Sequence, residues 1–166
     1  MLEQIANRRS VRKFLEKPVE KEKLLEIVKA GMQAPSAGNQ QPWQFVIITE
    51  KETLNLLSKT APGAKPLEQA SAAIVILNHN QNLRFPEFVH QDLGACTQNI
   101  LLEVVNQNLG AVWIGVAPIE ERIKYVKNTL KLNDNKIPFN IIAIGYCEDN
   151  SNYFKDRFDN NKIIWE

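Results

Sequence analysis

The chain has 166 residues, 44% of them hydrophobic, with 20 Lys and Arg against 19 Asp and Glu for a formal net charge of +1. This composition excludes a disordered chain. The balance of charges does not match the strongly basic character of a nucleic-acid-binding protein. The length predicts a single domain over residues 1–166. No apolar run approaches the roughly 20 residues of a membrane span. The segment MLEQIANRRS has no signal-like apolar core, so a cytoplasmic location without export is expected.

Hydrophobic periodicity in the first half of the chain predicts helices that alternate with short strands. A helix between Pro18 and Pro35 carries an apolar stripe, and "AAIVIL" reads as a fully buried strand. The expected elements are a helix from Leu2 to near Arg8, a helix with the stripe Leu24, Leu25, Ile27, Val28 and Met32, a strand over Gln44–Thr49, a small helix over 51–59, and a strand over 72–77.

The second half contains the longest helical pattern, from Glu87 to Leu109. Leu101 and Val105 widen its apolar stripe beyond one contact face, which predicts burial on two sides, and Gly110 is expected to be its C-cap. The stripe itself consists of Val89, Leu93, Cys96, Ile100 and Val104. A strand or extended loop over 111–116, a helix from Pro118 to about Leu130 and a strand over 139–146 complete the pattern, which predicts an α+β or α/β sandwich on one small sheet.

The usual catalytic groups are scarce. Cys96 and Cys147 form no metal or redox motif and are expected to be reduced, buried thiols. His79 and His90 are not spaced as metal ligands, and no G-x-S-x-G, G-x-G-x-x-G or P-loop motif occurs. If the protein is an enzyme, a cofactor therefore carries the chemistry, and no metal site is expected.

Three stretches could still bind a ligand. "NRRSVRKF" (7–14) is either a solvated basic turn or a phosphate cradle, because guanidinium groups bind phosphate bidentately. "APSAGNQQPWQF" (34–45) is either a surface loop or a loop shaped for a flat polar ligand, with Asn39 and Gln40 offering donors and acceptors. "LGAVWIGVAP" (109–118) is either a buried strand or a backbone laid along an aromatic ring.

These stretches, in this order, resemble the FMN-dependent nitroreductase family. The family pattern R-R-S-x-R-K-F/Y appears here at 8–14, a P-V element at 18–19, and A-P-S-x-x-N-x-Q-P-W at 34–43. "QNILLEVVNQNLG" (98–110) is similar to the family's long helix, but Asn108 replaces a glycine, and Val104 or Val105 replaces a small residue. "VWIG" (112–115), "IIAIGY" (141–146) and the tail "RFDNNKIIWE" (157–166) follow at the places expected for short family members.

The resemblance implies an α+β, nitroreductase-like sandwich with a small central sheet flanked by helices. It also implies a homodimer in which each FMN lies at the interface and contacts both subunits, and a C-terminal tail that wraps the partner subunit. Such docking would account for Ile163, Ile164 and Trp165 at the end of a polar tail. The segments between 60 and 72 and between 76 and 87 are shorter than in long family members, which implies a more open active site.

The resemblance also implies roles for individual residues. Arg8, Arg9 and Ser10 would hold the FMN phosphate, and Arg12 would approach N1 and O2 of the ring. The partner-facing loop and the strand near Gly115 would contact the ring. The full set of implied cofactor-binding residues is Arg8, Arg9, Ser10, Arg12, Pro35, Ser36, Ala37, Asn39, Trp113, Ile114, Gly115, Arg157 and Lys162.

The implied activity is transfer of hydride from NADH or NADPH through FMN to a small nitroaromatic or quinone, by a ping-pong mechanism without a catalytic side chain. Two alternatives stay open. The same fold and cofactor could support dehalogenation, ring oxidation or flavin fragmentation, or the protein could be a non-enzymatic flavin-binding sensor.

Overall fold

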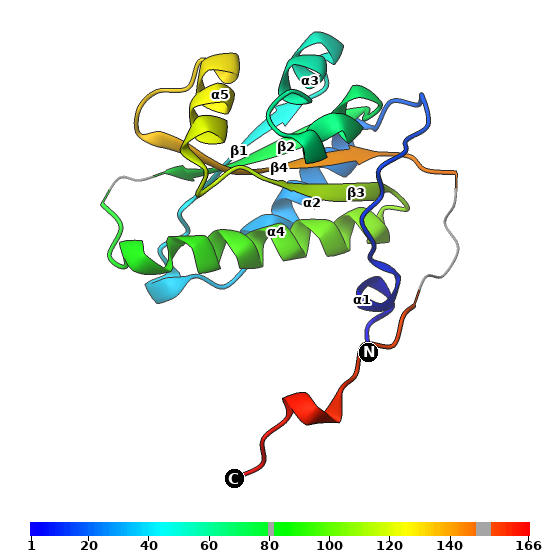
Figure 1. Cartoon of the computed structure of the whole chain (residues 1–166), viewed down its shortest axis with the longest axis vertical. Coiled ribbons are helices and arrows are strands. Elements are labelled where there is room, and N and C mark those ends of the chain that lie inside the picture. Colours follow the sequence, from blue (N-terminus) through cyan, green and yellow to red (C-terminus); the bar gives the residue numbers. More distant parts are fainter. Residues whose placement is uncertain (80–81, 149–153) are drawn as a thin grey trace.

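A computed structural model describes residues 1–79, 82–148 and 154–166. Its centre is a four-stranded, fully antiparallel sheet with the strand order β1-β2-β4-β3 (Figure 1). The strands are β1 (Trp43–Ile48), β2 (Ala72–His79), β3 (Gly110–Gly115) and β4 (Lys136–Gly145). The predicted α+β class is confirmed, and β3 is a strand rather than a loop.

Helices cover both faces of the sheet (Figure 1). One face carries α2 and α4, and the other carries α3, α5 and a 3-10 segment over Pro62–Glu68; the short α1 lies beyond β3. The helices are α1 (Glu3–Asn7), α2 (Lys21–Met32), α3 (Lys51–Leu57), α4 (Val89–Asn106) and α5 (Glu120–Leu130). Each predicted helix is therefore present, with ends that differ by a few residues.

The two central strands explain why "AAIVIL" is apolar without alternation. Ile74 and Ile76 pack into the core under α2 and α4, whereas Ala73 and Val75 pack into the core on the opposite face. All four side chains are fully buried. A strand buried on both faces has no position for a polar side chain, so the apolar run is continuous.

The C-terminal end of α4 differs from the prediction. Asn108 adopts a left-handed conformation (φ 57°), and the amides of Asn108 and Leu109 donate to the carbonyls of Val105 and Val104. This is a Schellman motif with asparagine in place of glycine. Gly110 instead begins β3, where a β-carbon would lie 2.8 Å from Val11, so its small size serves close packing rather than helix termination.

The buried face of α2 also differs in part. Leu24, Ile27 and Val28 are buried as expected, whereas Leu25 and Met32 are 46% exposed. Gly31 takes the place of a larger residue at the contact with α4. A β-carbon on it would lie 2.8 Å from Cγ1 of Ile100 and 3.2 Å from Sγ of Cys96.

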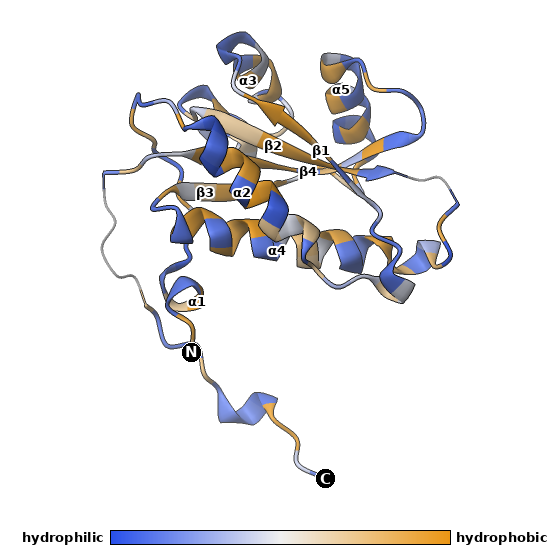
Figure 2. Cartoon of the chain, turned by 180° about the vertical axis from the view of Figure 1, so that it is seen from behind, coloured by the Kyte–Doolittle hydropathy of each residue, from blue (hydrophilic) through white to orange (hydrophobic). Residues whose placement is uncertain are grey.

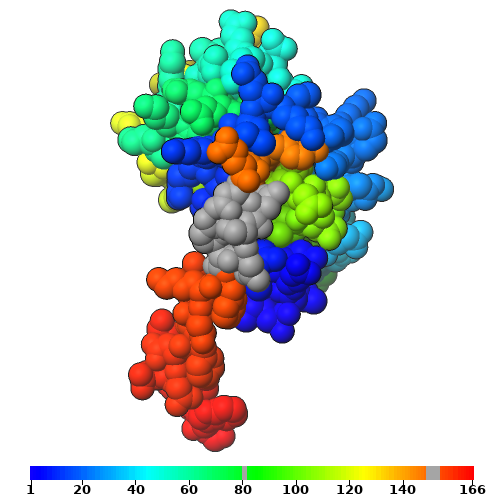
Figure 3. Space-filling view, turned by 90° about the vertical axis from the view of Figure 1, so that its right-hand side faces the viewer, coloured from blue at the N-terminus to red at the C-terminus, as the bar shows by residue number. Residues whose placement is uncertain are grey.

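Residues 154–166 extend away from the body of the chain (Figures 2 and 3). Ile164 and Trp165 are 86% and 87% exposed, and Phe158 is 73% exposed. Within one chain, these apolar side chains have no core to enter. Docking of the tail on a partner subunit stays a prediction.

In the part of the chain that the structure describes, no helix combines the length and the apolar character needed to cross a membrane.

Gly31→Ala is expected to lower the free energy of unfolding by about 1–3 kcal/mol through overpacking. This loss should exceed the helix-propensity gain of up to about 1 kcal/mol, because Ile100 is fully buried and cannot move aside. Urea unfolding measures the change. The double variant Gly31→Ala/Ile100→Val, with a smaller side chain at position 100, should recover part of the lost free energy of unfolding. A Gly31→Ala variant as stable as the wild type would contradict the close α2–α4 contact.

Candidate functional site

The basic N-terminal segment runs along the free edge of β3. Ser10 forms an isolated parallel bridge with Ala111, and the Val11 amide donates to the Ala111 carbonyl at 2.8 Å. Arg8 and Arg9 are half-buried, whereas Ser10 and Arg12 are exposed. These contacts fix the backbone of the segment along the edge of the sheet.

Tyr146 holds the far end of this segment. Its carbonyl accepts the Leu15 amide at 2.8 Å, and its hydroxyl accepts from Lys23 Nζ at 3.0 Å and donates to Glu20 at 2.8 Å. The hydrogen bond to Tyr146 raises the pKa of Lys23. A backbone hydrogen bond, followed by the bond from Tyr146, lowers the pKa of Glu20. Both shifts favour the charged forms of these groups.

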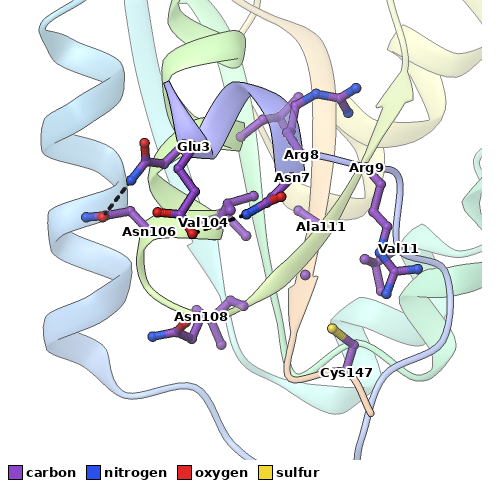
Figure 4. Close-up of a pocket in the computed structure, with 15 residues that line it drawn as sticks. Glu3, Asn7, Arg8, Arg9, Val11, Val104, Asn106, Asn108, Ala111 and Cys147 are labelled. Carbon is purple, nitrogen blue, oxygen red and sulfur yellow. Dashed lines mark hydrogen bonds between the residues drawn. The ribbon is translucent and has the colours of Figure 1, made fainter. Parts of the chain in front are cut away.

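Two hollows lie on either side of the segment, and Arg9, Val11 and Cys147 line both of them. The α1 cavity, of about 290 Å³, lies between α1 and the end of α4. The Arg12 cavity, of about 410 Å³, includes Ser10, Arg12 and Lys13. Figure 4 shows the α1 cavity, with Cys147 entering from the end of β4. Space for an anionic group therefore exists on both sides of the arginines.

The three predicted residues of β3 have different surroundings. Ile114 is buried, Trp113 is 38% exposed, and Gly115 is exposed. A β-carbon on Gly115 would meet nothing within 4 Å. Trp113 packs edge-on against Phe139 at 6.0 Å between ring centroids, and His90 lies 5.4 Å from Phe139. The strand thus leaves open space beside Gly115, next to an aromatic wall.

The loop Pro35–Asn39 lies elsewhere. It connects α2 to β1, and the buried Pro42 and Trp43 anchor it to the sheet. Its hydroxyl and amide groups bond within the loop: Ser36 Oγ accepts the Gln41 amide at 3.0 Å, and Asn39 Oδ1 accepts from Gln41 Nε2 at 3.1 Å. Asn39 is exposed and so remains accessible to a ligand.

One chain does not bring the two groups of predicted residues together. The loop leads into β1, whereas Arg8–Arg12 and Trp113–Gly115 belong to the β3 edge, and β1 and β3 are the opposite edges of the sheet. Three strand spacings, roughly 14 Å, separate these edges. In a single protomer, the arginines and the loop therefore belong to different surfaces.

Arg157 and Lys162 lie on the projecting tail, and both are exposed. Lys162 Nζ lies 3.8 Å from Asp159 Oδ2. Neither residue is among the described residues that line the α1 cavity or the Arg12 cavity. The structure of one chain thus leaves these two predicted phosphate contacts away from Arg8 and Ser10.

The sequence interpretation missed Asp92 and misassigned Gln40. Asp92 is only 5% exposed and accepts hydrogen bonds from the Ala37 amide and from Gln40 Nε2. The amide of Gln40 therefore faces inward rather than toward a ligand. A signal was present in the sequence, since Asp92 follows Val89 by three positions and precedes Cys96 by four, which places a carboxylate within the apolar stripe of α4.

The two thiols also differ from the expectation that both are buried. Neither is in a disulfide; Cys96 is buried, whereas Cys147 is half-buried. Burial raises the pKa of the Cys96 thiol to about 12, because the protein interior disfavours the thiolate. Among the described residues, no group of three or more His, Cys, Asp and Glu side chains could hold a metal ion.

The model of the Nitroreductase family matches residues 5–74 and 55–146. A protein of Archaeoglobus fulgidus, provisionally named NADH dehydrogenase/NAD(P)H nitroreductase, is 36% identical over 98% of this chain and 95% of its own length. A similarly named protein of Methanothermobacter thermautotrophicus is 34% identical over 100% of this chain and 86% of its own. The chain therefore belongs to the nitroreductase family.

Solved structures share the whole fold. A protein of Clostridium acetobutylicum, provisionally named NADH oxidase, superimposes with a TM-score of 0.95 at 45% identity, covering 98% of each chain. An FMN-dependent nitroreductase of Clostridium difficile R20291 gives 0.90 at 30% identity, covering 99% of this chain and 98% of its own. A nitroreductase of Desulfovibrio desulfuricans in complex with FMN gives 0.83 at 27% identity, with coverage of 98% and 94%.

The difference between the thiols predicts their reactivity. In flavin-free native protein, we expect the thiol reagent DTNB to label Cys147 and to reach Cys96 only after unfolding, because the thiolate is the reactive form. Cys147→Ser should abolish labelling of the native protein, and Cys96→Ser should leave it unchanged. Rapid labelling of the native Cys147→Ser variant would show that Cys96 is not protected by burial.

Proposed function

We propose that the protein is an FMN-dependent oxidoreductase that transfers hydride from NADH or NADPH to a small electron-poor acceptor, a nitroaromatic or a quinone, by a ping-pong mechanism. The observation that carries the proposal is the attachment of Arg8–Arg12 to β3 beside two cavities, through the Ser10–Ala111 bridge. Arg8 and Arg9 line the α1 cavity, and Arg9, Ser10 and Arg12 line the Arg12 cavity. Each cavity therefore presents guanidinium donors of the kind that bind a phosphate monoester.

The residues present fit FMN at several points. Arg8, Arg9 and Ser10 supply donors for the phosphate. Gly115 lacks a side chain where a β-carbon would stand in open space, so a planar ring could approach the backbone of β3. Family membership supports this fit, since relatives of this fold include an FMN-dependent nitroreductase and a nitroreductase in complex with FMN.

A second copy of the chain would complete the site. Pro35, Ser36, Ala37 and Asn39 lie at the sheet edge opposite to Arg8, so within one chain they belong to a different surface. In a homodimer, the loop of one protomer would line the ring and ribityl chain of the flavin held by the other. The exposed tail, with Ile164 and Trp165, would pack on the partner, and Arg157 or Lys162 could then approach a phosphate.

Bound FMN supplies the hydride chemistry. The chain itself contributes binding and electrostatics. Arg12 would set a positive charge at the pyrimidine edge of the ring, where negative charge develops on reduction. The tilted rings of Trp113, Phe139 and His90 would form an aromatic wall beside the reacting region. No side chain is required to act as an acid or base, in accord with the scarcity of catalytic groups.

A spectroscopic experiment tests the proposed function and separates its alternatives. Purified protein reconstituted with FMN should show flavin absorbance, bleach when NADPH or NADH is added without oxygen, and regain its colour on addition of a quinone or nitroaromatic. Bleaching without recovery on these acceptors favours different chemistry at the same cofactor. Bound flavin that neither nucleotide bleaches favours the sensor. Failure to bind FMN contradicts the proposal.

Arg8→Ala is expected to weaken FMN binding by about tenfold or more, because a hydrogen bond to a charged group contributes about 1.5–3 kcal/mol. Lys124→Ala removes the same charge from an exposed position on α5 that is not among the described residues lining either cavity. It serves as the matched control, with FMN affinity near that of the wild type. Flavin content after gel filtration measures the effect. Stoichiometric FMN in Arg8→Ala would show that the phosphate assignment is wrong.

The same assignment predicts protection of a thiol. Cys147 lines both cavities beside Arg9, so bound FMN should slow the labelling of Cys147 in the wild type and have little effect in Arg8→Ala. The rate of reaction with DTNB at several FMN concentrations measures this effect without any turnover. Equal rates with and without saturating FMN would place the flavin away from the arginines.

A further inference from the structure

A buried carboxylate joins the loop before β1 to the first turn of α4. Asp92 is 5% exposed. Its Oδ1 accepts the backbone amide of Ala37 at 2.9 Å, and its Oδ2 accepts from Gln40 Nε2 at 2.7 Å. Burying a carboxylate costs free energy unless donors satisfy its oxygens. Here the donors come from the loop, so the cost is offset only when the loop is in place.

Gln40 extends the connection to a second segment. Its Oε1 accepts the Phe85 amide at 3.0 Å, and its Nε2 donates to the Phe85 carbonyl at 3.0 Å as well as to Asp92. Both ends of the Gln40 amide are therefore assigned, and the side chain cannot turn over without losing these bonds. We call the Asp92–Gln40–Phe85 connection the loop clamp.

The loop needs such a clamp because its backbone is unusual. Gly38, Asn39 and Gln41 have φ values of 54°, 56° and 47°, respectively, in the left-handed region. Non-glycine residues adopt this region at a cost and persist there when their surroundings hold them. Phe85 adds a steric limit, since a β-carbon on Gly38 would lie 2.5 Å from Phe85 Cε2. The clamp thus selects one conformation among those open to the loop.

We infer that Asp92 and Gln40 are positioning residues, which hold Pro35–Asn39 in the shape that receives the flavin of a second copy of the chain. The inference rests on the proposed function. Neither side chain would touch the cofactor. Asp92 acts through the Ala37 amide and through Gln40, and the exposed Asn39 is the part of the loop that they present.

The fixed polarity of the clamp allows a test by reversal. Each single variant sets two like groups against each other. In Asp92→Asn an amide N–H can face the N–H of Gln40, and in Gln40→Glu a carboxylate faces the carboxylate of Asp92. In Asp92→Asn/Gln40→Glu, Asn can donate to Glu, while the Ala37 and Phe85 amides keep their acceptors. The donor to the Phe85 carbonyl is lost, and a carboxylate oxygen then faces that carbonyl oxygen, so the reversal restores the clamp only in part. A double-mutant cycle isolates this coupling.

Each single variant is expected to bind FMN about tenfold or more weakly, and the double variant should bind FMN more tightly than the summed losses of the two single variants predict. The FMN dissociation constant is measured by fluorescence quenching at a temperature at which circular dichroism shows all variants folded. The inference would be overturned if the single variants bound FMN as tightly as the wild type. It would also be overturned if the loss of FMN binding free energy in the double variant equalled the sum of the losses in the two single variants. If Asp92→Asn does not fold, Gln40→Ala carries the test with the same expected loss.

Thr97→Val is the matched control. Thr97 lies on α4, is fully buried, donates to the Leu93 carbonyl and accepts from Asn140 Nδ2 at 2.8 Å. The variant loses buried hydrogen bonds on the same helix without touching the loop. It should lose stability but bind FMN like the wild type. Equal loss of FMN in Thr97→Val and Asp92→Asn would show that general destabilisation, not the clamp, governs affinity.

Mixed dimers test whether the clamp acts on the partner's flavin. In a dimer of one Arg8→Ala and one Asp92→Asn protomer, isolated with two different tags, both defects fall on one site and the other site is intact. We expect half the flavin content of the wild type, well above that of either variant alone. If the mixed dimer holds no more flavin than the dimers of either variant alone, the clamp does not act on the flavin of the partner subunit. If the wild type binds no FMN, the proposed function fails. If the wild type binds FMN and the Asp92 and Gln40 variants bind it equally well, only the clamp is refuted.

Discussion

The pairing of β2 with β4 is the constraint on which the rest of the structure depends. These strands occupy the centre of the sheet and are buried on both faces, so their hydrogen bonds can be satisfied only by each other and by the strands beside them. β1 and β3 must then take the two edges. Because the arginine segment pairs with β3 and the Pro35–Asn39 loop precedes β1, the sheet order alone separates the two halves of the proposed site.

This separation gives the proposed dimer a physical reason. A ligand that needs both the cations and the loop would have to be bound by two chains, with the exposed tail available to join them. The tail carries Phe158, Ile164 and Trp165 into solvent in one chain, an arrangement that a partner surface would stabilise. The assembly, the single-domain organisation and the cytoplasmic location stay predictions, as do the acceptor and the order of the reaction.

Much of the fold could be predicted because periodicity reports burial directly. The stripe of α4 and the apolar run of β2 were assigned correctly, and the family assignment from the ordered motifs is confirmed. The predictions fail where the position of a residue in the sequence does not reveal its neighbours in space. Gly110 has the position of a helix C-cap, yet it makes room for Val11, and Asn108 is the residue that ends the helix. Leu25 and Cys147 were expected to be buried, but Leu25 is exposed and Cys147 is half-buried.

The sequence by itself determined the elements, the α+β class and the segments that carry chemistry, because local spacing and motif order are properties of the chain. Only the tertiary structure decided which segments meet. Asp92 and Gln40 are distant in sequence, and no local pattern relates a carboxylate on one helix to the amide of a loop that precedes a strand. Their contact depends on how α4 packs beside α2 and β1, and such packing is settled by the shapes of many buried side chains at once.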